Sequence, residues 1–222
     1  MKRLSLFLLA AILAMAVLSG AAYADVIYDN GGYSLTDGWL SVDGTTDYRM
    51  ADDFTLTNAT TITDIHWWGY YSNQDAEGDF TITIYEHDAE DYTPDAGQIR
   101  HVLHPASIIK EAIPEASSFD IYEYSINVSP LTLTADTTYW LSIINTDVSW
   151  NWSENILGPS FGFAYFNNIT TEPNIDWGYT IEHSGLAFTL TNDAVETPEP
   201  ATMLLLGFGI IGLAGVRRKF KK

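Results

Sequence analysis

The stretch FTITIYEH, residues 80–87, indicates the fold, because large apolar side chains alternate in it with threonine. Successive residues of a β-strand point to opposite faces of a sheet, so Phe80, Ile82 and Ile84 share one face. Three further stretches show the same period of two: FDIYEYSINV (residues 119–128), TYWLSIIN (residues 138–145) and GLAFTL (residues 185–190). Short β-branched and aromatic runs of this kind predict an antiparallel β-sandwich.

Each of the three further stretches predicts its own set of side chains on one common face. These sets are Tyr122, Tyr124 and Ile126; Tyr139, Leu141 and Ile143; and Leu186, Phe188 and Leu190. Residues 25–197 show no convincing amphipathic helix, since apolar residues do not recur there with a period near 3.6. We therefore expect a single all-β domain over residues 25–196.

The charge of the chain excludes one large class of partner. Residues 25–199 hold all 29 acidic residues and only three basic ones, which makes their formal charge about −26. Nucleic acid is excluded, because phosphate binding requires a basic surface. The chain has no cysteine, which excludes disulfides, thiolate metal ligands and a cysteine nucleophile within it. The acids either keep an exported domain soluble or attract divalent cations.

The first 24 residues have the layout of a secretory signal peptide. Lys2 and Arg3 precede an apolar run over residues 4–18, and Ala22 and Ala24 form a small-x-small cleavage site. Cleavage there by signal peptidase would leave a mature chain that begins at Asp25. The alternative is a retained membrane helix, but the apolar run is short for that role.

The C-terminal segment joins a short apolar run to a basic end. Residues 201–216 carry no charge. As a transmembrane helix they would span about 24 Å, against roughly 30 Å for the hydrocarbon core of a bilayer. The basic end, residues 217–222, can reach past that gap and predicts a cytoplasmic C-terminus. A signal peptide that places the preceding domain outside the cytoplasm agrees with this orientation.

Pro198, Glu199 and Pro200 stand just before this apolar run. The order of the three parts resembles the PEP-CTERM sorting signal of Gram-negative bacteria, a tail also called the ice-binding protein C-terminal domain. The resemblance implies that residues 197–222, with Arg217 and Arg218 at the basic end, are recognised by exosortase, a membrane-embedded cysteine transpeptidase. It also implies cleavage near Pro-Glu-Pro and transfer to the cell surface or the exopolysaccharide matrix. The alternative is a plain membrane anchor with an incidental Pro-Glu-Pro.

A second resemblance covers much of the middle of the chain. MADDFTLTNATTITDIHWWGYYSN, residues 50–73, is similar to a segment of uncharacterised exported bacterial domains. The stretches that begin at Phe80 and Thr138 follow in the order seen in those domains. The resemblance implies a jelly-roll-like sandwich and supplies no activity.

Aromatic residues are the first candidates for a binding site, because flat exposed rings stack on the faces of sugars. The candidate tryptophans are Trp67, Trp68, Trp150, Trp152 and Trp177. Trp150 and Trp152 share one strand face, whereas the adjacent Trp67 and Trp68 must face opposite sides. The competing interpretation is that these rings fill a large core, and for any one tryptophan alone we prefer it.

Acidic residues offer two further kinds of site. Asp52 and Asp53 are the first candidates for one structural calcium ion, because calcium takes about six to eight oxygen ligands. Otherwise one of them bonds backbone amides and the other is solvated. Two carboxylates roughly 5 to 9.5 Å apart could also hydrolyse a glycosidic bond, but the sequence singles out no pair.

These observations predict an exported, non-catalytic protein of the cell surface or extracellular matrix that binds polysaccharide or mediates adhesion. A polysaccharide-acting hydrolase is the first alternative, and a purely structural matrix protein is the second. The expected partners are signal peptidase, exosortase, the membrane before processing, and exopolysaccharide. An exposed aromatic patch without convergent acids would favour binding, and two facing carboxylates would favour the hydrolase.

Overall fold

Strands form the regular structure of the domain, which we describe from a computed structural model. It describes residues 24–43, 48–73, 76–114, 120–156, 158, 161–167 and 177–192. None of these residues lies in a helix, so the all-β prediction is confirmed for them. They include no helix long and apolar enough to cross a membrane. The signal peptide, the Pro-Glu-Pro motif and the predicted helix over residues 201–216 lie outside the described residues.

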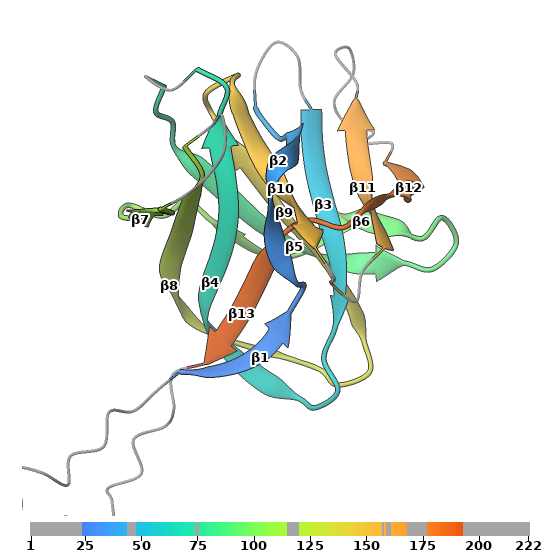
Figure 1. The fold of residues 1–222 in the computed structure, drawn as a ribbon. Coiled ribbons are helices and arrows are strands. Elements are labelled where there is room, and N and C mark those ends of the chain that lie inside the picture. The colour runs from blue at the N-terminus through green and yellow to red at the C-terminus, as the bar shows by residue number, and fades with distance from the viewer. Residues whose placement is uncertain are drawn as a thin grey trace, which may run out of the picture. The chain divides into compact units, whose positions relative to one another are not determined.

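The described strands form two antiparallel sheets (Figure 1). The seven-stranded sheet contains β1 (Asp25–Asp29), β2 (Gly32–Leu40), β4 (Thr60–Tyr71), β7 (Ile109–Ala112), β8 (Tyr122–Leu133), β10 (Trp150–Ile156) and β13 (Phe188–Asn192). The six-stranded sheet contains β3 (Tyr48–Thr55), β5 (Phe80–Asp88), β6 (Thr93–Leu103), β9 (Thr138–Asn145), β11 (Phe161–Asn167) and β12 (Gly178–Ser184).

Strand β4 is the centre of the seven-stranded sheet. One of its edges pairs with β8, which also pairs with β7, and its other edge pairs with β13 and β10. The six-stranded sheet has the order β12-β11-β3-β9-β5-β6. Strands β2, β3, β4 and β5 alternate between the two sheets. At the base of the domain in Figure 1, β1 lies beside β13, and Asp25 pairs with Asn192. The two ends of this unit therefore lie side by side.

The facing sides of the two sheets form one apolar core. The period-two prediction is confirmed, because eleven of the twelve residues predicted to lie on common faces are buried in this core. The eleven are Phe80, Ile82, Ile84, Tyr124, Ile126, Tyr139, Leu141, Ile143, Leu186, Phe188 and Leu190. The remaining predicted residue, Tyr122, is half-buried and packs against the core.

Tryptophan rings supply much of the volume of this core. Trp67 stacks on Tyr124 with ring centroids 5.6 Å apart, and Trp150 meets Phe80 edge to face at 5.0 Å. Gly69 makes room for the second contact, because a Cβ at this position would lie 2.8 Å from the Trp150 ring. A side chain at position 69 would therefore displace Trp150.

A smaller apolar cluster lies on the outward face of the six-stranded sheet. Its buried members are Ala51, Tyr85, Trp140, Ala164 and Trp177. The indole N–H of Trp140 donates to His87 Nδ1 at 3.0 Å, and the rings of Tyr92 and Tyr179 pack edge-on against Trp140. This cluster explains why β9 is apolar on both sides: Tyr139, Leu141 and Ile143 face the core, and Trp140 faces the outer cluster.

Alkaline pH is expected to destabilise the domain. Burial, and then the charge of Asp53, raises the pKa of Tyr179 to about 12, and burial also raises the pKa of Tyr28. A tyrosine whose folded pKa exceeds its unfolded value of about 10 binds its proton more tightly when folded. Its stabilising contribution is complete below pH 10 and, for Tyr179, is lost as the pH rises from 10 to 12.

Urea unfolding at pH 9 to 12, followed by circular dichroism, would measure this loss. We expect the urea midpoint to fall steadily above pH 10, and to fall less in Tyr179→Phe. A midpoint that stays constant up to pH 12 would contradict the explanation.

Candidate functional site

Strand β4 presents a row of functional side chains on the outward face of the seven-stranded sheet. Asp64, His66 and Trp68 point outward, because the alternate residues Ile65 and Trp67 are buried in the core. The local sequence DIHWW thus separates into an apolar inner face and a polar and aromatic outer one.

Neighbouring strands add polar residues to the same face, because residues opposite each other in an antiparallel pair share a face. Glu123 of β8 lies opposite Trp68, and Thr189 of β13 lies opposite His66. We call the resulting set the outer polar face. It consists of Asp29, Asp64, His66, Trp68, Glu123, Thr189 and Thr191, with Tyr33 of β2 stacked on Trp68.

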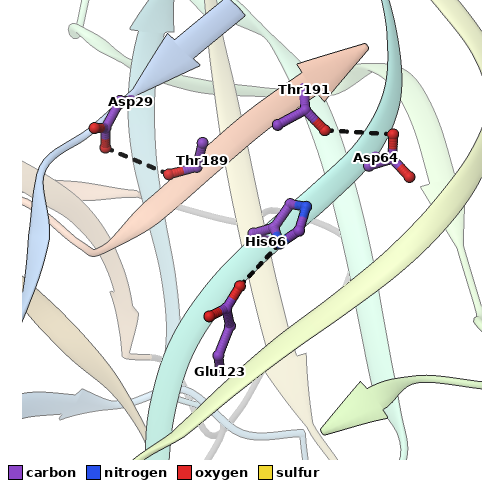
Figure 2. Close-up of polar contacts among 6 residues, drawn as sticks. All are labelled: Asp29, Asp64, His66, Glu123, Thr189 and Thr191. Atoms are coloured by element: carbon purple, nitrogen blue, oxygen red, sulfur yellow. Dashed lines mark hydrogen bonds and ion pairs between the residues drawn. The ribbon is translucent and has the colours of Figure 1, made fainter. Parts of the chain in front are cut away.

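Polar contacts tie adjacent strands together across this face, as Figure 2 shows. They are His66 Nδ1 with Glu123 Oε1 at 3.0 Å, the Thr191 hydroxyl with Asp64 at 3.3 Å, and the Thr189 hydroxyl with Asp29 at 3.3 Å. The side chains of His66 and Glu123 are 30% and 38% exposed, so a ligand can reach both. The contacts hold these groups in place, and Thr191, which is buried, serves to hold Asp64.

An aromatic pair lies beside these polar groups. The rings of Trp68 and Tyr33 are stacked, with centroids 5.8 Å apart and planes 19° from parallel. Both residues are half-buried, so part of each faces solvent. Such a surface can take the apolar face of a sugar ring while neighbouring carboxylate, imidazole and hydroxyl groups bond the sugar hydroxyls.

The outer polar face is acidic. It carries three carboxylates, on Asp29, Asp64 and Glu123, and one imidazole, which is bonded to Glu123. A surface of this sign attracts cations and repels anions, with a range of about 8 to 10 Å at ordinary salt. The arrangement therefore favours ligands that are neutral or positively charged.

Three of the five candidate tryptophans cannot stack on a sugar. Trp67, Trp150 and Trp152 are fully buried in the core, so their rings present no face to solvent. Trp177 is 7% exposed and belongs to the cluster on the other sheet. Only Trp68 of the five lies on the outer polar face, so the structure does not bring the set together. The competing interpretation, that these rings fill the core, is correct for Trp67, Trp150 and Trp152.

Asp52 and Asp53 do not face a common ion. Asp52 points inward from β3 and is fully buried, whereas Asp53 lies opposite Trp140 on the outward side. The Asp52 carboxylate accepts hydrogen bonds from Asn30 Nδ2 at 2.7 Å and from the backbone N–H of Leu186 and of Asp53. Within the described ranges, no group of three or more His, Asp and Glu side chains could hold a metal ion.

The sequence reasoning missed most of the outer polar face. The alternation in DIHWW was sufficient to place Asp64, His66 and Trp68 together. No local pattern, however, connects them with Glu123 or Tyr33, because strand pairing brings those two residues to the face from distant parts of the chain.

Two family models match the chain. The model described as a domain of unknown function, DUF7901, matches residues 32–191, and the model of the PEP-CTERM protein-sorting motif matches residues 196–219. The second match includes Pro198-Glu199-Pro200 together with Arg217 and Arg218, and it confirms the resemblance drawn from those residues. The motif is the recognition signal of exosortase, so the chain is an exported, membrane-associated protein processed by that enzyme. No curated protein matches the sequence.

Proposed function

Because the chain belongs to the DUF7901 family of domains of unknown function and ends in a PEP-CTERM sorting motif, we propose that it is a non-catalytic polysaccharide-binding protein of the cell surface or extracellular matrix. The observation that carries the proposal is the Trp68–Tyr33 pair beside the polar groups of β4, β8 and β13. An aromatic platform with flanking hydrogen-bonding groups is the usual composition of a sugar-binding surface.

Export and anchoring complete the proposal. In this proposal signal peptidase cleaves after Ala24, and the apolar segment 201–216, predicted from the sequence to be a helix, holds the protein in the membrane until exosortase acts on the tail. The described domain begins at Asp25, and the family match to the tail begins at residue 196. The domain can therefore fold outside the membrane with both processing sites beyond its strands.

The charge of the outer polar face narrows the class of polysaccharide. Its three carboxylates disfavour polymers rich in uronic acid, because like charges repel at short range. Neutral polymers, and polymers with free amino groups, remain as ligands. The exopolysaccharide that the producing cell secretes is the natural one to test.

Trp68→Ala is expected to weaken polysaccharide binding about fivefold while leaving the fold intact, since stacking on an aromatic ring contributes roughly 1 kcal/mol. Affinity electrophoresis and sedimentation with a neutral, an amino-bearing and an acidic polysaccharide would measure this. Tyr165→Ala is a matched control, because Tyr165 is an exposed tyrosine of the six-stranded sheet.

Three outcomes of the same assay would change the conclusion. Binding that survives Trp68→Ala would move the site away from the outer polar face. Release of new reducing ends, lost in Glu123→Gln, would establish the hydrolase. Failure to bind any polysaccharide, in calcium or in EDTA, would leave a structural matrix protein.

A further inference from the structure

Strand β7 continues the outward face of the seven-stranded sheet beyond β8. In this pair of strands Glu111 lies opposite Glu123 and Ile109 lies opposite Ser125, so Glu111 and Ile109 point outward together with Glu123. All four residues of β7 are exposed. The outer polar face therefore has a neighbouring strip on β7, where one carboxylate and one apolar side chain both meet solvent.

Three outward side chains lie in one row across β4, β8 and β7. Trp68 is opposite Glu123, and Glu123 is opposite Glu111. Adjacent strands are about 4.8 Å apart, so the row spans roughly 10 Å. Strands β2 and β8 lie on opposite sides of β4, which places Trp68 between the ring of Tyr33 and the two glutamates. An aromatic surface thus continues directly into a pair of carboxylates.

The two glutamates bring like charges together with no lysine or arginine beside them to offset the repulsion. Residues directly opposite each other in an antiparallel pair have Cβ atoms about 4.5 to 5.5 Å apart, and like charges in this position destabilise a sheet. Residues 25–199 hold three basic residues. Arg49 and Arg100 belong to β3 and β6 of the other sheet, and the Lys110 ammonium lies on the inward side of β7, 4.1 Å from the centre of the Tyr122 ring. A positive charge from outside the domain, placed between the two carboxylates, would remove the repulsion.

Glu123 is held in a position to receive such a charge. His66 Nδ1 lies 3.0 Å from Glu123 Oε1 and keeps the carboxylate on the outward face, as Figure 2 shows. A carboxylate has about four lone-pair sites, so one contact with His66 leaves room for another donor. The Glu123 side chain is 38% exposed and Glu111 is exposed, so a donor from solvent can reach both. An ammonium group has three N–H donors and can therefore bond to both carboxylates at once.

We propose that the polysaccharide bound at the outer polar face carries free amino groups, one of which lies as an ammonium between Glu111 and Glu123. The proposal rests on the function proposed for that face and names the class of ligand. One sugar ring stacks on Trp68, and the amino group of that ring or of the next one reaches the two carboxylates. The row from Trp68 to Glu111 supplies both contacts side by side, which a polymer of flat rings with charged nitrogens can use together.

Two other kinds of cation match this surface less well. Calcium takes about six to eight oxygen ligands, and no group of three or more His, Asp and Glu side chains in the described part of the chain could hold a metal ion. A lysine-rich peptide would satisfy the carboxylates but would offer no sugar ring to stack on Trp68. The aromatic residue in the same row as the glutamates therefore favours an amino sugar.

Isothermal titration calorimetry with two matched oligosaccharides would test the proposal. The probes are a glucosamine hexamer and an N-acetylglucosamine hexamer, which share the same rings and differ in the charge on nitrogen. The full-length chain is used in an uncharged detergent without a sugar headgroup at about pH 5.5, where the amino groups are protonated and glutamate, with an ordinary pKa of about 4.3, is ionised. We expect the glucosamine hexamer to bind about tenfold more tightly at low salt, and the difference to shrink as added salt screens the exposed charges.

Glu111→Gln is the decisive variant. It keeps the shape of the side chain and relieves the opposition of like charges, so the melting temperature should not fall. The affinity for the glucosamine hexamer should fall about two- to fivefold, as expected for one exposed charge pair, and the affinity for the N-acetylglucosamine hexamer should stay the same. Glu111→Lys should abolish the preference, because its own ammonium would pair with Glu123. Glu90→Gln is the matched control, since it removes an exposed glutamate from the turn after β5 and should change neither affinity.

The proposed function and this choice of ligand fail in different ways. If both hexamers bind equally well and Trp68→Ala weakens both, the sugar site stands and the amino-bearing ligand is overturned. The same holds if neither hexamer binds but another polysaccharide does, whereas the proposed function fails as well if no polysaccharide binds. The proposal is also overturned if Glu111→Gln has no more effect than Glu90→Gln. A lysine hexamer that binds as tightly as the glucosamine hexamer, and equally well to Trp68→Ala, would overturn it in favour of a basic peptide.

Discussion

Replacing Trp152 by alanine should lower the free energy of unfolding by about 3 to 5 kcal/mol, the usual loss when a large buried aromatic side chain is removed. Trp152 is fully buried, and its indole N–H donates to the Ala187 carbonyl at 2.9 Å. The substitution leaves a cavity between β10 and β13 and removes one of two hydrogen bonds to the Ala187 carbonyl, which keeps the bond from the Trp68 backbone N–H at 3.4 Å. A loss of this size approaches the whole stability of many domains.

Trp68→Ala is the matched comparison, since it removes the same side chain from the outward face of the same sheet. Urea unfolding should separate the two, with a large loss for Trp152→Ala and a loss within about 1 kcal/mol for Trp68→Ala. Loss of polysaccharide binding in a Trp150 or Trp152 variant would therefore report unfolding and not a missing contact. Equal losses in the two variants would show that Trp68 is also a core residue.

Replacing Asp52 by alanine should cost about 2 to 4 kcal/mol of stability, because it leaves buried N–H groups without an acceptor. The carboxylate of Asp52 joins the two sheets: it sits on β3 and accepts from Asn30 and from the backbone of Leu186. Asn30 Nδ2 keeps a second bond, to the Leu186 carbonyl at 2.8 Å. The backbone N–H groups of Leu186 and Asp53 would lose this acceptor.

Two neighbouring variants make this measurement specific. Asp52→Asn keeps the shape and one acceptor, so it should lose less than Asp52→Ala. Asp53→Asn alters the adjacent acid on the outward side and should have the smallest effect of the three. If calcium raises the melting temperature of the original protein and not that of Asp52→Ala, the inward carboxylate binds an ion and our account of it is wrong.

Local patterns predicted the faces of the strands but not their neighbours. The alternation over residues 80–87 and 138–145 identified core residues correctly, because the two faces of a strand follow directly from its geometry. The same reasoning could not tell which of the two faces of β9 would meet solvent. Both are covered, one by the core and the other by the cluster around Trp140.

The candidate sites depended on contacts that no local pattern contains. Trp150 and Trp152 share a face, as predicted, but that face is the inner one. Two aromatic residues on one strand face give the same sequence pattern whether they face the core or a ligand. Only the position of the opposing sheet distinguishes the two cases. Asp52 was likewise a candidate calcium ligand from the sequence, until the segment just before β13 brought the N–H of Leu186 to it.

The amino-acid sequence alone was sufficient to predict the all-β class, the inward and outward faces of the strands, and the sorting tail. Each of these depends on residues that are close in sequence. The tertiary structure decided which of the candidate tryptophans reaches the outer polar face and where Asp52 finds its partners. His66 and Glu123 are 57 residues apart, and Asp52 and Leu186 are 134 apart. Contacts at such separations arise from the pairing of strands and the packing of sheets, which depend on the whole chain at once.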